Sequence, residues 1–407
     1  MRLDLAVLDA PERLLGRLRP SDGAYDIGRA RALQIWSLVG LAALARHDGP
    51  RPAAVRLDGP GDAAGFARAV GFADVVAGTP PRQPGERGRT VALRRFKGHG
   101  GIEPAAHEIA ALVLPDRPDE ESRRVVQYVI VELLRNVVQH SADPLGGVVA
   151  AQRMDKQQKY ETPCIQVAVA DAGIGVLAAM QDLHPELADA EAAVEKAIQP
   201  HISGKFEEGL TGNAVNAGMG LFFIHEMAKL STGRLLIATR GAGRFVEGNP
   251  RDVEHPGLRL LRPIGTGFPG TLVAFELPLG RVLDYDGLIA AIGEKARRRI
   301  PRRAVRRWVR FDAGTPAGAR FLVARAAEDT TAAERFSAQT LVPRLLHREP
   351  LVLDFTGIDV CTQSFLHALL FRAVRLAWAE HVEIHVANAR PAVRSGIETV
   401  EAYALGG

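Results

Sequence analysis

The sequence predicts an α/β protein of the α+β sandwich kind, and three observations support this. Short apolar runs of strand length alternate with longer segments whose apolar residues recur at helical spacing. Apolar residues make up 47% of the 407 residues and charged residues 24%, as in ordinary globular proteins. No apolar run reaches the roughly 18 residues that a membrane-spanning helix needs, so no membrane partner is expected.

The N-terminal part, residues 1–80, is predicted to be a small α/β domain. Residues 24–46 carry apolar side chains at helical spacing, 53–59 are typical of a short buried strand, and 62–76 of a second helix. Pro, Gly and charged residues then predominate, so a linker is placed at 81–90.

The middle part, residues 91–282, is predicted to be one larger domain. A long amphipathic helix ends near His140, and Asp119 and Glu120 suit the dipole at its start. The other elements are predicted in this order: strands at 91–97, 144–153 and 162–171, helical structure at 176–200, a loop at 204–220, a helix at 221–232, a strand at 233–240, a hairpin at 241–268 and a strand at 270–279.

The C-terminal part is predicted to contain a basic linker helix at 283–310 and a second small α/β domain at 311–407. In that domain, strands are expected at 319–327, 349–357 and 381–388, with helices at 330–348 and 363–380 and in the tail. The net charge is +4, and Lys and Arg crowd residues 295–310 without an acid. Two interpretations stay open: a patch for nucleic acid or an anionic membrane surface, or a solvated linker helix that pairs with nearby acids.

Three motifs point to a nucleotide site, and the first lies on the long helix of the middle part. Glu132 and Asn136 are four residues apart, so both project from one helix face, with His140 one turn further. A carboxylate beside a carboxamide suits a water-activating base next to a ligand of magnesium, which prefers oxygen. Alone, the pattern also fits an exposed polar stripe.

The second motif, Asp171-Ala172-Gly173-Ile174-Gly175, directly follows an apolar strand. An acid at a strand end can accept a hydrogen bond from the exocyclic amine of adenine, and the glycines let the backbone approach a flat ligand. The alternative is a plain turn between a strand and a helix. The spacing is neither that of a dinucleotide-binding fingerprint nor that of a P-loop.

The third motif opens a predicted helix, whose N-terminal amides favour phosphate oxygens. It consists of Asn216, Gly218, Met219, Gly220 and Leu221. The loop before it could fold over the phosphates as a lid, through Ser203, Lys205 and Thr211. A flexible connector is the alternative.

Together, in this order, the motifs resemble the GHKL superfamily of ATP-binding proteins, which includes DNA gyrases and histidine kinases. The resemblance covers about residues 91–282, where Gly270-Thr271 at the start of the last strand resembles the terminal G-T element of that family. It implies a Bergerat fold, a central mixed sheet with helices on one face, and it implies ATP and Mg²⁺ as cofactors.

The resemblance also implies roles for the matched residues. Asn136 would bind Mg²⁺, Asp171 would bind the adenine, and Glu132 would be the catalytic general base. Thr271 would support the adenine end of the pocket. The rest of the pocket would be shaped by Gly173, Gly175, Gly218, Met219, Gly220 and Leu221. The position of Lys205 in the loop suggests a phosphate contact.

The C-terminal domain resembles STAS-like domains, on the strand LVLDFTGIDV and the helix start CTQSFLHALL. In anti-sigma antagonists of that family, a GHKL kinase phosphorylates a serine at about the position of Ser364. Thr362 stands where they carry an aspartate, and Phe365 stands where they carry a glycine. Ser364 could instead cap the helix. Residues 1–80 are a candidate for a second STAS-like domain.

Two functions therefore stay open for a regulatory, ATP- and magnesium-binding protein. One is a serine/threonine kinase of partner switching that transfers the γ-phosphoryl group to a STAS domain. The other is an ATP-hydrolysing conformational switch, for example in bacterial stress or phage defence. A protein partner is expected, and a homodimer by analogy alone. Cys164 and Cys361 have no metal-type spacing, and with no signal peptide in view we expect a cytoplasmic location.

Overall fold

The structure is a computed structural model of the chain. It describes residues 5–16, 24–28, 30–45, 54–58, 62–80, 89–98, 100–116, 120–155, 162–201, 218–249, 251, 257–261, 268–280, 283–300, 306–311, 319–326 and 329–406. It divides into two compact units, Met1–Gly98 with Pro104–Lys196 and Ile224–Val282, and His99–Glu103 with Ala197–Phe223 and Leu283–Gly407. Parallel and antiparallel sheets are both present, so the predicted α/β class is confirmed.

A seven-stranded sheet forms the centre of the first unit, in the order β10-β9-β8-β11-β7-β6-β5. Its strands are β5 (Arg94–Phe96), β6 (Gly147–Met154), β7 (Cys164–Asp171), β8 (Arg234–Thr239), β9 (Ala242–Glu247), β10 (Gly257–Leu261) and β11 (Thr271–Pro278). Every pair among these strands is antiparallel, so the central sheet is not mixed as expected, and parallel pairing is confined to the other sheets. All eight residues of β7 are buried, because both faces of this central strand are covered.

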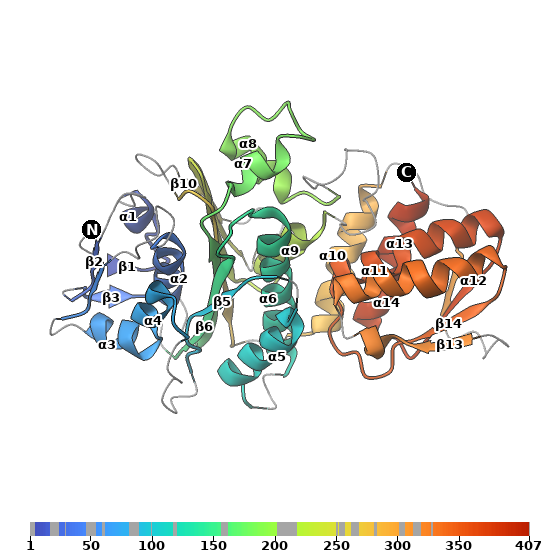
Figure 1. Cartoon of the computed structure of the whole chain (residues 1–407), viewed down its shortest axis with the longest axis horizontal. Coiled ribbons are helices and arrows are strands. Elements are labelled where there is room, and N and C mark those ends of the chain that lie inside the picture. Colours follow the sequence, from blue (N-terminus) through green and yellow to red (C-terminus); the bar gives the residue numbers. More distant parts are fainter. Residues whose placement is uncertain are drawn as a thin grey trace. The chain divides into compact units, whose positions relative to one another are not determined.

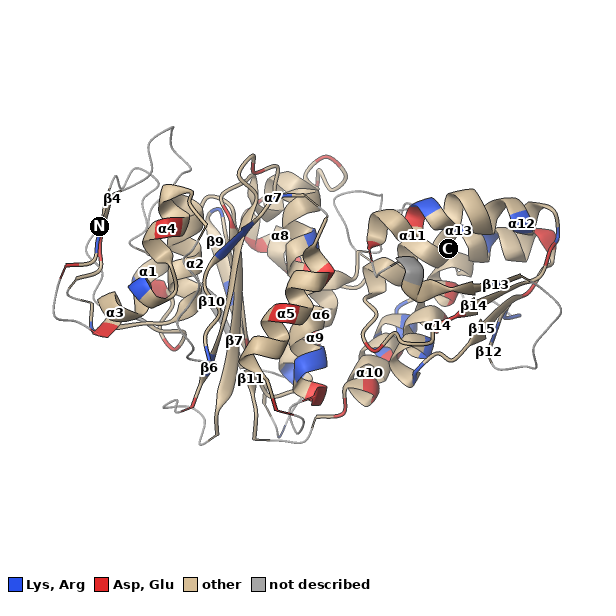
Figure 2. Cartoon of the chain, turned by 60° about the horizontal axis from the view of Figure 1, so that its bottom comes forward, with Lys and Arg blue, Asp and Glu red and all other residues tan. Residues whose placement is uncertain are grey.

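Helices cover one face of this sheet, as Figures 1 and 2 show from two directions. They are α5 (Ile102–Val113), α6 (Glu120–His140) and α9 (Gly220–Leu230). Glu120 and Glu121 lie in the first turn of α6, which suits the helix dipole. The segment predicted as helical at 176–200 forms two short helices, α7 (Gly175–Met180) and α8 (Ala190–Ala197).

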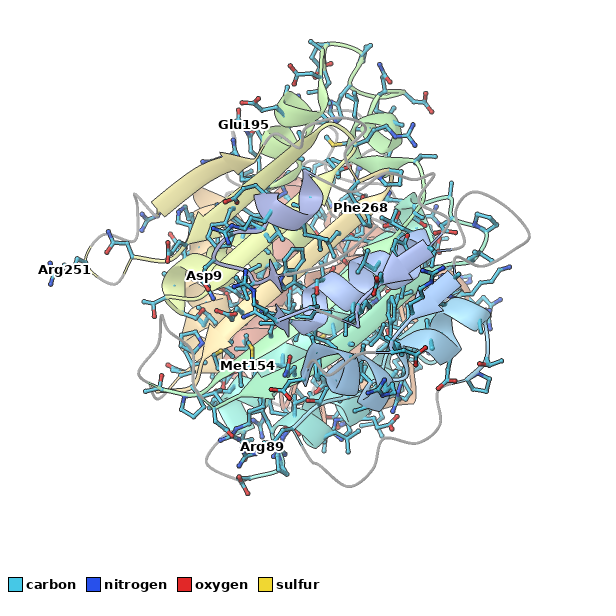
Figure 3. The ribbon with its side chains drawn as sticks, turned by 90° about the vertical axis from the view of Figure 1, so that its left-hand side faces the viewer. Asp9, Arg89, Met154, Glu195, Arg251 and Phe268 are labelled. Atoms are coloured by element: carbon cyan, nitrogen blue, oxygen red, sulfur yellow. The ribbon has the colours of Figure 1, made fainter. Side chains whose placement is uncertain are left out.

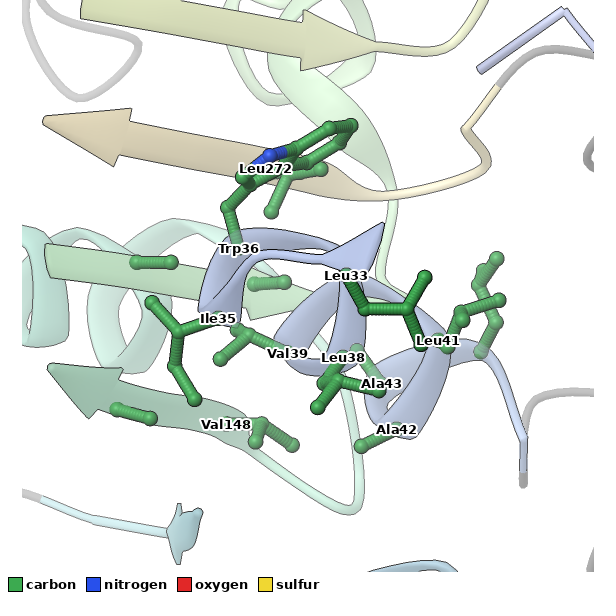
Figure 4. Close-up of a cluster of buried hydrophobic side chains, with 14 of the residues drawn as sticks. Leu33, Ile35, Trp36, Leu38, Val39, Leu41, Ala42, Ala43, Val148 and Leu272 are labelled. Carbon is green, nitrogen blue, oxygen red and sulfur yellow. The ribbon is translucent and has the colours of Figure 1, made fainter. Parts of the chain in front are cut away.

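The opposite face is covered by α2 (Ile35–Leu44), although helices were expected on one face only. Every residue of α2 is buried, and the helix contacts β6, β7 and β11. Figure 4 shows its side chains against those of Val148 and Leu272. Gly40 lets the helix lie close to β11, since a Cβ there would stand 3.2 Å from Cδ2 of Leu272. The N-terminal segment therefore forms the hydrophobic core on this face of the sheet.

The rest of the N-terminal segment surrounds α2 with short elements. They are β1 (Leu5–Ala6), α1 (Glu12–Leu15), β2 (Ala24–Asp26), β3 (Ala32–Leu33), β4 (Ala54–Arg56), α3 (Asp62–Ala69) and α4 (Phe72–Ala77). The helix predicted at 24–46 begins only at Ile35. The carboxylate of Asp26 accepts a hydrogen bond from the amide of Gly28, a local turn that competes with helix formation. The predicted strand at 53–59 is shorter, and it is exposed at Ala54 and Arg56 rather than buried.

A buried polar network joins this segment to the sheet. The amide of Trp36 donates to the side chain of Gln166, which donates to Glu276 over 3.0 Å. Arg234 pairs with Glu276 at 2.6 Å and with Asp9 at 2.7 Å. Asp9, labelled in Figure 3, is thus connected by ion pairs to the interior of the sheet.

The second unit contains a parallel four-stranded sheet, in the order β12-β15-β14-β13. The strands are β12 (Val309–Phe311), β13 (Ala319–Leu322), β14 (Leu351–Asp354) and β15 (Ile384–Ala387). The helices are α10 (Tyr285–Arg298), α11 (Thr330–Phe336), α12 (Val342–Leu346), α13 (Gln363–Glu380) and α14 (Pro391–Leu405), with a 3₁₀ turn at Val323–Ala326 and a π-turn at Ser337–Leu341. Helices connect consecutive strands from β13 to β15, as parallel pairing requires.

The segment predicted as a basic linker helix, 283–310, belongs to this unit. Gly293 of α10 packs against Ser395 and Thr399 of α14. The end of the basic run forms β12. This strand was not predicted, because charged residues flank its few apolar ones.

Several arginines of the described part of the basic run are paired with acids. Arg306 and Arg310 each contact Glu383, and Arg307 contacts Glu398 at 2.9 Å. These pairs match the interpretation of a solvated segment with nearby acids. Among the described residues, no helix has the length and apolar character to cross a membrane.

Candidate functional site

Asp171 is the last residue of the central strand β7 of the seven-stranded sheet, and it is 3% exposed. Its Oδ1 accepts hydrogen bonds from the amides of Gly173 at 2.9 Å and Thr271 at 3.3 Å. Among the described residues, no hydrogen bond reaches Oδ2. The carboxylate is therefore fixed through one oxygen while the other can accept from a ligand.

Burial raises the pKa of Asp171 to about 7, and the nearby charge of Asp143 adds to the rise. The two accepted amide hydrogen bonds act in the opposite direction, because they favour the charged form. A carboxyl held this way can change its protonation near neutral pH. Buried acids with such a shift are candidates for a functional site.

The last strand of the sheet brings Gly270 and Thr271 beside Asp171. Thr271 stands opposite Asp171 on one side and Thr239 on the other. A Cβ at Gly270 would collide with the backbone oxygen of Asp171, so only glycine fits there. The predicted neighbourhood of the second motif and the G-T element is thus present in the structure.

The loop after Asp171 contacts the C-terminal end of α6. The amide of Ile174 donates to the carbonyl of Ser141 over 2.8 Å, and a Cβ at Gly173 would collide with that same carbonyl. Val137 of α6 packs closely on Gly147 at the start of β6. The first and second motifs are therefore brought to one region of the first unit.

Glu132 and Asn136 lie on α6 in different environments. Glu132 is 1% exposed, and its Oε1 is 3.9 Å from Nη1 of the buried Arg135. Asn136, one turn later, is half-buried, as is His140. Asn136 can therefore reach a ligand more readily than Glu132 can.

Gly175 takes a left-handed conformation, with φ +76°, at the start of α7. A Cβ there would stand 2.9 Å from Oγ1 of Thr239. That hydroxyl accepts from the amide of Val176 and donates to the carbonyl of Gly270, each over 3.0 Å. The second glycine of the motif is thus required by backbone conformation and by the closeness of Thr239.

The third motif begins α9, and only part of it is described. Gly218 has φ +61°, Met219 is buried, and its carbonyl accepts from the amide of Phe223. Gly220 is buried and Leu221 half-buried. These residues are grouped with the second unit, whereas α9 from Ile224 onward belongs to the first. The other predicted residues here lie outside the described residues: Ser203, Lys205, Thr211 and Asn216.

Two residues that the sequence analysis did not predict complete the surroundings of Asp171. The carboxylate of Asp143 accepts from the amide of Ala172 at 2.8 Å, and Thr239 contacts the other end of the same loop. Neither belongs to a spaced motif. The only signal was position, since Asp143 lies in the turn after the long helix and Thr239 ends a buried strand.

Ser364 lies in the first turn of α13, and it is half-buried. The helix cap is Thr362, whose Oγ1 accepts from the amide of Phe365 over 3.3 Å. The suggestion that Ser364 caps this helix is therefore wrong, because the cap position falls two residues earlier. Among the described residues, His, Cys, Asp and Glu side chains form no cluster of three or more that could hold a metal ion.

Comparisons with known family models, curated proteins and solved structures gave no match to this chain.

Proposed function

We propose that the chain is a regulatory protein of the GHKL type that binds ATP with Mg²⁺. The observation that carries the proposal is the buried Asp171, which two amides hold through Oδ1 while Oδ2 remains available. A carboxylate in this arrangement can accept a hydrogen bond from the exocyclic amine of adenine. The glycines at 173 and 270 keep the backbone free of side chains beside it.

Asn136 fits the role of the magnesium ligand. Asn136 is half-buried, and it lies on the helix whose end contacts the Asp171 loop. Mg²⁺ usually keeps waters and phosphate oxygens, so a single protein oxygen is a reasonable contribution. When bound, the metal would neutralise phosphate charge. Glu132 would accept a proton from the attacking hydroxyl or water, and Arg135 would hold its carboxylate in place.

The direct test is nucleotide binding by the purified chain. Calorimetry with ATP, with and without Mg²⁺, should show binding that the metal strengthens. In Asn136→Ala, Mg²⁺ should no longer strengthen ATP binding, whereas the affinity for ATP without the metal should be mostly retained. Equal Mg²⁺ dependence in both proteins would contradict the assignment of Asn136, and no binding by the unmodified chain would contradict the whole proposal.

Phosphoryl transfer to a STAS-domain Ser or Thr is the first candidate reaction, by the resemblance of the C-terminal domain. ATP hydrolysis that drives a conformational switch is the second, and the half-burial of Ser364 favours it. A kinase must reach the accepting hydroxyl, and partial burial hinders this.

Labelled ATP separates these two reactions. Label on the protein that Ser364→Ala removes would identify the kinase and its own STAS-like domain as substrate. Release of free phosphate without labelled protein would identify the ATPase. Glu132→Gln should slow either reaction by about 10²–10⁴-fold, the usual contribution of a general base.

A further inference from the structure

The loop from Ala172 to Val176 is held through its backbone amides by acceptors from separate parts of the first unit. The amide of Ala172 donates to Asp143, that of Ile174 to the carbonyl of Ser141, and that of Val176 to Thr239. The amide of Gly173 donates to Asp171 itself. Hydrogen-bonded amides on both sides of Gly173 keep a glycine-containing loop in one conformation.

Asp143 is built into this arrangement by its own turn. Its Oδ1 accepts from the amide of Leu145 at 2.8 Å, which leaves Oδ2 directed to Ala172. Its amide donates to the hydroxyl of Ser141, and its carbonyl accepts from Gly146. Since this turn directly follows α6, Asp143 connects the end of α6 to the loop that begins with Asp171.

Thr239 has the same function at the other end of the loop. It is fully buried, and its hydroxyl is used in both directions, accepting from Val176 and donating to Gly270. The hydroxyl therefore joins the start of α7 to the glycine beside Asp171.

We propose that Asp143 and Thr239 are positioning residues of the nucleotide site, which hold the Asp171 loop in its binding conformation before the nucleotide arrives. The inference rests on the proposed ATP-binding function. Preorganisation of this kind strengthens binding, because the loop then loses little conformational freedom when the ligand binds.

Asp143 differs from Thr239 in its charge. Its substitution should therefore change the pH dependence of ATP affinity, which a purely structural role would not change. Asp143 is the charged residue that raises the pKa of Asp171 by its proximity. The helix α2, which packs on β7, carries no titratable group. The other charged groups on elements packed around Asp171 are Glu132, Arg135 and His140 in the second half of α6, Arg240 after β8, and, farther away, Glu120, Glu121, Arg123 and Arg124 in the first half of α6 and Arg153, Arg234 and Glu276 toward the far strand ends.

The experiment measures ATP affinity between pH 6 and 9 for the full chain and for Asp143→Asn. We expect affinity to fall about tenfold at high pH, since a hydrogen bond to a charged acceptor is lost. The midpoint of the pH profile should also move to lower pH, because the neighbouring negative charge is gone. Titration of ATP itself is common to both proteins and cancels in the comparison.

Asp329→Asn is the matched control. The carboxylate of Asp329 also accepts from two backbone amides, those of Thr331 and Ala332, but it caps α11 in the second unit. Its affinity and midpoint should equal those of the unmodified chain. An unshifted midpoint in folded Asp143→Asn would overturn the role of Asp143, whereas absence of ATP binding by the unmodified chain would overturn the proposed function instead.

Thr239 is tested by a pair of variants. Thr239→Val keeps the shape and should weaken ATP about tenfold without moving the midpoint, and Thr239→Ser should restore affinity. Unchanged affinity in Thr239→Val would overturn its role. If a variant fails to fold, hydrogen exchange on the unmodified chain still tests the proposal. The amides of Ala172 and Val176 should be protected from exchange without ATP. Fast exchange at these amides would overturn the proposal.

Discussion

At Asp171 the folded protein holds a carboxyl where its charge is disfavoured. Burial raises its pKa from the ordinary value of 3.8 to about 7. The cost of this burial is absent below about pH 4, grows as pH rises, and is complete above about pH 7. Buried acids whose charged form is disfavoured in this way cluster at functional sites.

We expect Asp171→Asn to stabilise the protein and to abolish ATP binding. Both accepted hydrogen bonds use Oδ1, which asparagine keeps, and the charge is removed. The free energy of unfolding should rise by about 2–4 kcal/mol above pH 7. Urea unfolding at several pH values checks this: the gain should shrink as pH falls toward 4, and a gain that is equal at every pH would contradict the explanation.

Gly173→Ala should weaken ATP binding and destabilise the fold. The new Cβ would collide with the carbonyl of Ser141, so the loop must move, at a cost of about 1–3 kcal/mol. Gly65→Ala in α3 is the control, because outside the backbone of its own helix no atom lies within 4 Å of its Cβ position, and it should be neutral or slightly stabilising. Thermal unfolding and ATP calorimetry give both readouts. Equal behaviour of the two variants would argue against a tight approach at Gly173.

The sequence predicted the neighbours of Asp171 unevenly. Gly173, Gly175 and Thr271 follow from spacing and from their places beside strand ends. Asp143 and Thr239 could not be predicted, because their partners are backbone amides of a distant segment. Backbone donors leave no pattern of residue types in a sequence.

At the scale of elements, the ion pair between Arg234 on β8 and Glu276 on β11 is fully buried. Asp9, which is partly exposed, forms a second ion pair with Arg234. The side chains of Arg234 and Glu276 are at most 1% exposed, whereas that of Asp9 is 43% exposed. Removal of one partner of a buried ion pair destabilises the protein, because the other partner remains as a buried charge with neither a counter-charge nor solvent.

We therefore expect unequal effects from two substitutions in this network. Arg234→Met should cost about 3–5 kcal/mol in the free energy of unfolding, because Glu276 is left buried. Asp9→Ala should cost about 1 kcal/mol or less, since solvent already screens that carboxylate. Denaturant unfolding measures both, and similar costs would show that the pair with Asp9 is as important as the buried one.

Element predictions succeeded where apolar patterning is long and failed where tertiary contacts decide. The buried strands β7 and β11 and the helices α6 and α13 were predicted within a few residues. The helix α5 was not predicted at all, and α2 was predicted to begin too early, because Asp26 forms a turn with Gly28. No local signal showed that α2 would cover the sheet.

At the scale of the whole molecule, the N-terminal segment completes the core of the first unit. A chain lacking residues 1–80 should expose the apolar face that includes Val148, Ala168 and Leu272. We expect this truncated protein to aggregate, because such a large apolar surface is not tolerated in water. Light scattering and circular dichroism check this. Leu38→Ala in the full chain is a milder change of the same core and should lower the free energy of unfolding by about 2–5 kcal/mol. A soluble, folded protein without residues 1–80 would contradict the prediction.

The dependence of α2 on distant strands also affects how the chain is made. Asp9 and its partner Arg234 are 225 residues apart in the sequence. At about 5–20 residues per second, a ribosome needs roughly 10–45 s to synthesise that interval. For part of that time an uncharged helix with no polar face has left the exit tunnel before the strands that will bury it. Newly made chains should therefore be captured by chaperones at their N-terminus, and they should complete folding only after β11 has emerged.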